Sequence, residues 1–128
     1  MTMTYILLIE QYYTTYNITG GIMMAIQISS ELLDGCVLAL LSDEDYYGYA
    51  LTQRLQTTVA VSESTLYPVL RRLKKNGWVT TYDQAFQGRN RRYYQLTAAG
   101  QQQLTVVQAD WQSYYQAINQ LLKGEATS

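Results

Sequence analysis

The sequence of 128 residues contains no histidine and only one cysteine. Without histidine, the chain cannot build a Ser–His–Asp triad, a Cys–His pair or a histidine-ligated metal site. Cys36 has no second cysteine with which to form a disulfide, and it begins an apolar run that ends at Leu41. A lone cysteine in such a run is typical of a buried, unreactive thiol. These absences exclude the commonest enzyme chemistries and fit a reducing compartment.

Basic residues are missing before Arg54, and no apolar run approaches the roughly 18 residues of a membrane-spanning helix. The N-terminus therefore lacks the basic start of a secretory signal. The acids Asp43 to Asp45 have no other metal ligand near them in the sequence, so we expect a solvated loop there. These features predict a cytoplasmic protein of one domain without a metal, a cofactor, a membrane segment or an enzymatic activity.

The chain does contain a concentrated patch of positive charge. Between Arg71 and Arg92 only Asp83 is acidic, so this window carries a net charge of +6 while the rest of the chain carries −7. Seven of the nine basic residues lie in it, and they are called the basic island: Arg71, Arg72, Lys74, Lys75, Arg89, Arg91 and Arg92. A phosphate backbone would be attracted to this island. On charge alone, a solvated helix face followed by a charged hairpin explains the island equally well.

Residues 1–24 differ from the rest of the chain. The stretch before Gly20 is rich in Tyr, Thr and Ile and shows neither a helical nor an alternating period. We expect translation to start at Met23 or Met24, which would make residues 1–24 an extension that is either foreign to the native protein or disordered. The alternative is a genuine arm that packs on a neighbouring subunit.

The remaining chain carries helical signals first and strand signals later. Leucine and valine recur at three- and four-residue spacing, whereas β-branched and aromatic residues cluster further on. Serines and a threonine stand where helices would begin, and Gly77 stands where one would end. The predicted elements are helices over 29–42, 47–57 and 62–76 (the last capped by Ser62 or Ser64), strands over 78–82 and 91–96 joined by a loop over 83–90, and a helix over 97–122.

The last predicted helix carries a strict heptad pattern. Its apolar residues are spaced by 3, 4, 3, 4 and 3 positions, a narrower stripe than a helix on a globular core usually shows. A second copy of the chain is the expected partner for this stripe, and packing within the chain is the alternative. The predicted interface residues are called the seam: Leu104, Val107, Trp111, Tyr114, Ile118 and Leu121.

Three short helices followed by a hairpin give the order of a winged helix-turn-helix domain. In that fold the third helix enters the major groove of DNA and the hairpin, or wing, lies along nearby phosphates or the minor groove. The basic island falls on these two parts. We predict a mainly α-helical fold with a small β-hairpin wing, in which residues 25–96 form the winged helix-turn-helix and residues 97–128 form a long dimerisation helix and a tail.

The sequence resembles the PadR family of bacterial transcriptional regulators over residues 28–122. The likeness rests on Tyr47-Gly48-Tyr49, on the run from Ser64 to Leu73 with Gly77 after it, and on Arg91-Arg92-Tyr93-Tyr94-Gln95-Leu96-Thr97 followed by Gly100. With one long helix predicted at its C-terminal end and no further domain after it, the sequence resembles the short subfamily. The resemblance implies a dimeric repressor whose C-terminal helices form most of the interface. It also implies release from DNA by a small molecule, commonly an aromatic acid or a flat hydrophobic drug.

Several residues are candidates for contact with DNA through hydroxyl, amide or guanidinium groups. They are Ser64, Thr65, Tyr67, Arg71 and Lys75 on the third helix, and Arg89, Asn90 and Arg91 in the wing. Ser64 can instead be a helix cap and Tyr67 a packing ring. We expect Arg72 and Lys74 to be ordinary solvated charges. Since Tyr93 and Tyr94 alternate in a strand, one is expected in the core and the other free to reach a phosphate.

Trp111 lies in the middle of the seam, where it would approach its own copy in a dimer. Two facing indoles can hold a planar ligand, with Gln108 and Tyr115 lining the same pocket. The alternative is a tryptophan that fills the dimer core without a ligand, and the sequence does not choose between them.

Together these features predict a sequence-specific regulator that binds an operator in double-stranded DNA. We expect a homodimeric, ligand-responsive repressor with a small aromatic or hydrophobic effector. A winged helix can also serve as a protein–protein module without DNA, but such a module has no need for arginine on both the third helix and the wing. An enzyme is the least favoured class, because the carboxylates are scattered and no Gly-rich phosphate loop is present.

Overall fold

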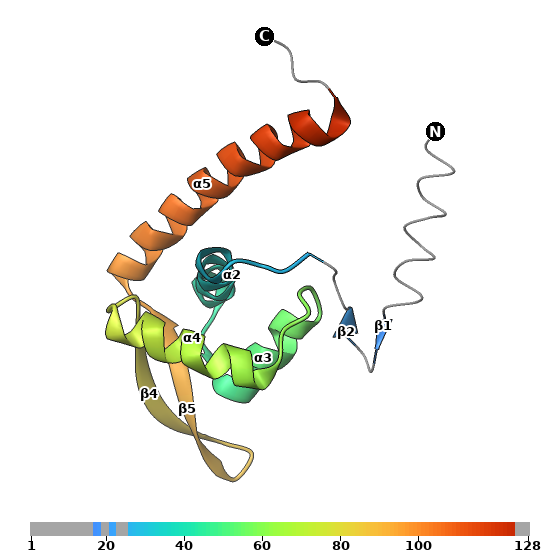
Figure 1. Cartoon of the computed structure of the whole chain (residues 1–128). Coiled ribbons are helices and arrows are strands. Elements are labelled where there is room, and N and C mark those ends of the chain that lie inside the picture. Colours follow the sequence, from blue (N-terminus) through green and yellow to red (C-terminus); the bar gives the residue numbers. More distant parts are fainter. Residues whose placement is uncertain (1–16, 19–20, 23–25, 125–128) are drawn as a thin grey trace.

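The computed structural model describes residues 17–18, 21–22 and 26–124 (Figure 1). Two short strands, β1 (Asn17–Ile18) and β2 (Gly21–Ile22), pair with each other antiparallel. The expected start of translation at Met23 or Met24 lies outside the described residues. None of the helices in the described part of the chain has the length and hydropathy needed to cross a membrane.

Four helices follow: α2 (Ser30–Asp43), α3 (Gly48–Gln56), α4 (Glu63–Lys75) and α5 (Ala98–Lys123). Of the two serines that could cap the first helix, Ser29 and Ser30, it is Ser29 that does so, since its hydroxyl accepts a hydrogen bond from the backbone N–H of Leu32. The hydroxyl of Thr97, at the predicted start of the last helix, accepts one from the backbone N–H of Gly100. A capping hydroxyl satisfies an N–H group that has no partner in the first helical turn. The helical half of the prediction is therefore confirmed to within a few residues.

The wing differs from its prediction in length and in strand number. Strands β4 (Val79–Phe86) and β5 (Arg89–Leu96) pair from Val79–Leu96 to Phe86–Arg89, so the predicted loop over 83–90 is wrong. Only Gln87 and Gly88 turn the chain, at φ of 52° and 77°. Two consecutive left-handed residues match the twist of a tight hairpin, which lets pairing continue to the tip. The missed strand β3 (Tyr46–Tyr47) pairs with β5, giving the order β3-β5-β4.

The core lies between α2, α3, α4, the first half of α5 and the base of the wing. It is built from leucine and valine side chains that are at most 4% exposed: Leu33, Val37, Leu38, Leu41, Leu51, Leu55, Leu66, Val69, Leu70, Leu73, Val79 and Leu104. Cys36 packs against the core without being fully buried, and burial raises the pKa of its thiol above the ordinary value. The observed architecture confirms the mainly helical, winged helix-turn-helix fold with a long C-terminal helix.

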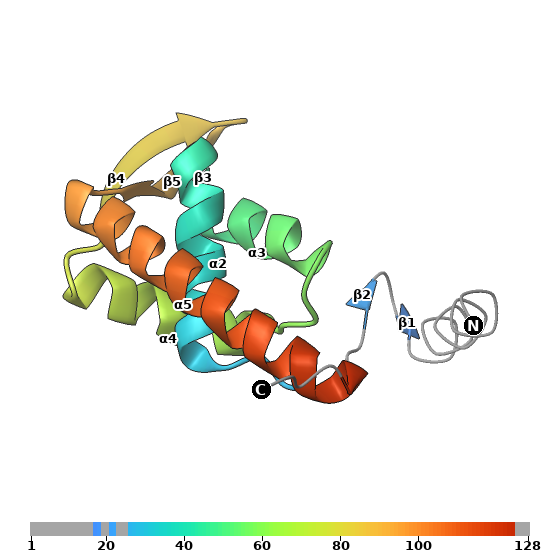
Figure 2. The same ribbon diagram turned by 90° about the horizontal axis from the view of Figure 1, so that it is seen from above.

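Helix α5 runs across α2 (Figure 2) and then continues beyond it (Figure 1). Gly35 of α2 marks the crossing, because a Cβ built on it would lie only 2.4 Å from a methyl carbon of Val107. The absence of a side chain at Gly35 is what allows the two helices to come this close. The first half of α5 is thus part of the domain, and the second half leaves it.

Candidate nucleic-acid interface

Helix α4 has one buried and one exposed face. Leu66, Val69, Leu70 and Leu73 are buried in the core. At about 100° per residue, the opposite side carries four of the five DNA-contact candidates of this helix, all of them exposed: Ser64, Tyr67, Arg71 and Lys75. The fifth candidate, Thr65, is exposed at the flank of this face, which is called the α4 stripe. The stripe is a polar and basic helix face of the kind that fits a DNA groove.

Ser62, and not Ser64, caps α4. Its hydroxyl accepts a hydrogen bond from the backbone N–H of Thr65 at 3.2 Å. The hydroxyls of Ser64 and Thr65 lie 2.9 and 3.0 Å from that of Ser62. The alternative role of Ser64 as a cap is therefore wrong, and three exposed hydroxyl groups gather at the positive end of the helix.

Tyr67 both packs and remains exposed. One edge of its ring faces the backbone of Gly48, where an added Cβ would lie 3.9 Å from the rings of Tyr67 and Tyr94, yet 44% of the residue is accessible. Tyr94 packs against the core, and burial raises the pKa of its hydroxyl. The nearby charges of Arg92 and Arg71 act in the opposite direction on that pKa. Tyr94 therefore lies where the base of the wing meets the α4 stripe.

The wing has two faces with different contents. Side chains alternate along β5, so Tyr94, Arg92 and Asn90 share the face that continues from the core, called the inner face. Tyr93, Arg91 and Arg89 lie on the opposite, outer face. Three neighbouring candidates of the sequence are therefore divided between two surfaces.

Aromatic rings hold Arg91 on the outer face. Its guanidinium carbon lies 4.4 Å from the centre of the Tyr47 ring and 5.6 Å from that of Phe86. Its Nε also donates to the carbonyl oxygen of Phe86 at 3.3 Å. Tyr93 stacks on Tyr82 with ring centres 5.4 Å apart. These contacts occupy the Nε–H group and one face of the Arg91 guanidinium, whereas Arg89 and Asn90 are exposed beside the turn.

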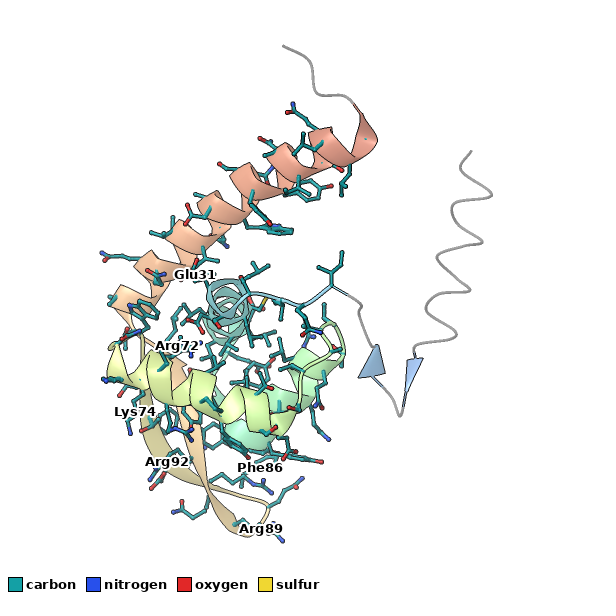
Figure 3. All side chains as sticks on the ribbon, viewed as in Figure 1. Glu31, Arg72, Lys74, Phe86, Arg89 and Arg92 are labelled. Carbon is teal, nitrogen blue, oxygen red and sulfur yellow. The ribbon has the colours of Figure 1, made fainter. Side chains whose placement is uncertain are left out.

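Arg92 was not among the predicted DNA contacts, but its position in the structure would allow it to bind a phosphate. It lies between α4 and the tip of the wing, which Arg89 marks (Figure 3). Its Nε donates to the carboxylate of Asp83 at 3.3 Å, and both side chains are largely exposed. An exposed ion pair of this kind is weak, so it can exchange for a phosphate. Alternation along the strand puts Arg92 on the inner face with Tyr94, and Arg91 on the outer face. This alternation is the sequence signal that could have identified Arg92 as a candidate.

Asp45 fixes the wing to the turn before α3. Its carboxylate accepts hydrogen bonds from the Tyr82 hydroxyl at 2.6 Å and from the Gln95 amide at 3.3 Å. The bond to Asp45 raises the pKa of Tyr82 to about 12. The expectation of a wholly solvated loop is wrong at this residue. No cluster of three or more metal-ligating side chains occurs among the residues that the structure describes.

Arg72 is not a solvated charge either. It donates from both Nε and Nη2 to the two carboxylate oxygens of Asp34 on α2, with the Nε bond at 3.2 Å. This bond raises the pKa of Arg72. The basic island thus offers fewer free charges on α4 than the sequence indicates.

The seam changes its surroundings along α5. Leu104 is 3% exposed in the core of its own chain and so has no surface to offer a partner, and Val107 packs on Gly35. Exposure then rises: Trp111 is 42%, Tyr114 63%, Ile118 36% and Leu121 66% accessible. The exposed remainder of the seam is called the distal seam: Trp111, Tyr114, Ile118 and Leu121.

The ligand candidates lie together on α5. The Trp111 ring is 5.7 Å from that of Tyr115 and 6.4 Å from that of Tyr114, measured between centres. Gln108, one turn before Trp111, is exposed. Within one chain these side chains form an open aromatic surface.

Comparison with known proteins agrees with this architecture. A family model described as the transcriptional regulator PadR-like family matches residues 37–106. The structure of smu.1704 from Streptococcus mutans UA159 is 36% identical, with a TM-score of 0.75, and covers 82% of this chain and 99% of its own. The PadR-like transcriptional regulator BC4206 from Bacillus cereus is 34% identical, with a TM-score of 0.66, and covers 71% and 91%. The transcriptional regulator Rv3488 from Mycobacterium tuberculosis is 40% identical over 65 residues, which are 50% of this chain and 61% of that protein.

Proposed function

Because the chain belongs to the PadR-like family of transcriptional regulators, and to its short subfamily with one long C-terminal helix, we propose that it is a ligand-responsive repressor that binds an inverted-repeat operator as a homodimer. The observation that carries the proposal is the position of the α4 stripe beside the inner face of the wing. Together they present hydroxyl and guanidinium groups on one side of the domain. Such a regulator works in the cytoplasm, where it meets its operator.

In the proposed complex, each α4 enters a major groove. Ser64, Thr65 and Tyr67 approach bases or phosphates near the start of the helix, and Arg71 and Lys75 bind phosphates. The wing follows the adjacent backbone with Arg89, Asn90 and Arg92. Arg91, held on the outer face against the rings of Tyr47 and Phe86, contributes less.

The distal seam is the proposed centre of the dimer. Exposure of four large apolar side chains to water is unfavourable, and their burial against the same face of a second copy lowers the free energy. Val107, at the boundary with the domain, completes the interface. Two copies place two α4 helices on the same side of the assembly, as an inverted repeat requires.

The proposed effector is a planar aromatic or hydrophobic molecule held between two copies of Trp111. Gln108 supplies a polar contact and Tyr115 a second ring. If the two indoles instead fill the dimer core, no such ligand binds. A Trp78→Phe variant leaves Trp111 as the only indole, so quenching of its fluorescence by acridine orange or benzoate distinguishes the two arrangements. Trp111→Ala should abolish the binding of either probe and leave operator binding intact.

DNA binding is tested by fluorescence anisotropy with a labelled fragment from upstream of the protein's own gene, at several salt concentrations. If about four phosphates are neutralised per subunit, log K falls with a slope of roughly −7 against log salt. Tighter binding than to a scrambled fragment makes the protein sequence-specific. No binding at low salt overturns the proposal and favours a protein–protein module. Loss of repression of a reporter gene in a deletion strain then separates a repressor from an activator.

A further inference from the structure

One arginine of the basic island is turned away from the α4 stripe. Arg72 extends from α4 toward α2 (Figure 3), where both of its donating nitrogens bind the carboxylate of Asp34. The two residues are 38 positions apart in the sequence. A planar guanidinium that meets both oxygens of a carboxylate fixes the orientation of its partner as well as its distance. The pair therefore joins two helices in a defined geometry.

Asp34 is the buried member of the pair, because its side chain is 9% exposed whereas that of Arg72 is 39% exposed. A buried carboxylate without its partner is strongly unfavourable, which makes the separated arrangement of α2 and α4 costly. The next residue, Gly35, is the point where Val107 of α5 touches α2. Helix α2 is thus held by α5 at one residue and by α4 at its neighbour.

We propose that Asp34 and Arg72 are positioning residues that set the orientation of α4 relative to α2 and α5, and that Arg72 does not bind a phosphate. The inference rests on the proposed function, because the orientation matters for fitting two α4 helices to one operator. In a dimer joined through α5, the position of each α4 depends on the contacts from Val107 to Gly35 and from Asp34 to Arg72.

Charge and position predict opposite results for Asp34. Replacing Asp34 with asparagine removes a negative charge, so by electrostatics alone the variant should bind DNA more tightly than the wild type. If Asp34 positions α4, the same change weakens binding. Likewise, Arg72→Lys keeps the positive charge that a phosphate ligand needs and loses the two-pronged bond that positioning needs.

The experiment measures operator affinity against salt concentration for Asp34→Asn, Arg72→Lys and Arg72→Gln in the full chain. Arg71→Gln on the α4 stripe is the matched control for a phosphate contact. We expect each Asp34 or Arg72 variant to weaken binding by about fivefold to tenfold at one salt concentration, without changing the slope. Arg71→Gln should reduce the slope by about 1.8 per dimer, for one phosphate in each subunit. The double variant Asp34→Asn/Arg72→Gln should bind no more weakly than Arg72→Gln, because both changes break one contact.

Circular dichroism and sedimentation establish that each variant is folded and dimeric before its binding is read. If Arg72→Gln does not fold, Asp34→Asn and Arg72→Lys still decide the matter. A slope reduced by Arg72→Gln as by Arg71→Gln, or an affinity of Asp34→Asn at or above that of the wild type, overturns the inference while the proposed function stands. Absence of DNA binding by the wild type overturns both.

Discussion

The two ends of the molecule are exposed for different reasons. At the end formed by α4 and the wing, leucines and valines are buried within the chain and most of the exposed side chains are polar or basic. On the distal seam the exposed side chains are large and apolar, from Ile118 at 36% to Leu121 at 66%. A polar, basic surface is well solvated by water and attracts a negatively charged partner. Covering an apolar surface lowers the free energy of the protein in water.

This difference gives the two surfaces opposite responses to salt. Screening weakens contacts between a basic surface and phosphates, so DNA binding falls steeply as the salt concentration rises. Burial of the distal seam involves few charges and should change little over the same range. The crossing of α2 and α5 connects the two surfaces and is part of neither the basic surface nor the distal seam.

The largest effect is expected where the seam is already buried. Leu104→Ala leaves a cavity in the core and should lower the free energy of unfolding by about 2–5 kcal/mol. Leu121→Ala, on the same seam, should cost less than about 0.5 kcal/mol in the separated monomer, because Leu121 is 66% exposed there. Urea denaturation at several protein concentrations separates the stability of the chain from that of the dimer. Equal losses for the two variants at every concentration would place Leu121 in the core of its own chain.

A charge on the distal seam should break the dimer and leave the domain folded. Ile118→Glu would bury an unpaired carboxylate between two helices, and we expect the dissociation constant of the dimer to rise by about 30-fold or more. Gln116→Glu adds the same charge to the opposite side of α5 and is the matched control. Sedimentation velocity gives the fraction of dimer, and circular dichroism shows whether the helices remain. A dimer that tolerates Ile118→Glu does not use the distal seam.

The sequence predicted the parts whose signal is local. Helix caps such as Thr97 and the leucine spacing of α4 depend on residues a few positions apart, so their pattern is visible without the fold. Near its tip the wing is exposed on both faces, so its sequence shows no alternation of apolar and polar residues. Strand pairing there depends on the turn at Gln87 and Gly88. The length of the wing was therefore missed.

Contacts between distant residues could not be predicted in the same way. Nothing near Arg72 in the sequence distinguishes it from Arg71, and its partner Asp34 is on another helix. The heptad pattern also continues unchanged through Val107, although the seam is covered by its own chain up to that residue and is exposed after it. A periodic pattern shows that a helix has an apolar face, and it does not show whether the same chain packs against that face.

The cost of a substitution at Gly35, where α2 and α5 cross, should depend on the side chain at position 107. Gly35→Ala places a Cβ against the branched side chain of Val107, so we expect a loss of about 1–2 kcal/mol in unfolding free energy. In a Val107→Ala background the two methyl carbons are removed and only the Cβ at position 107 remains, 3.1 Å from the added Cβ. The same change should then destabilise the protein by about 1 kcal/mol less than it does in the wild type. Thermal and urea denaturation of the four combinations measures this. Destabilisation of equal size in both backgrounds would mean that Val107 is not the obstacle.

The smallest predicted effect lies in the wing and separates its two faces. Arg92→Ala removes an exposed charge on the inner face and should reduce the salt slope of operator binding by about 1.8 per dimer. Arg91→Ala removes a side chain that binds Tyr47 and the Phe86 carbonyl on the outer face, and it should change the slope less. Asp83→Asn is the control, because it frees Arg92 from its ion pair and should tighten binding. If Arg91→Ala lowers the slope as much as Arg92→Ala does, the wing presents both faces to the phosphates.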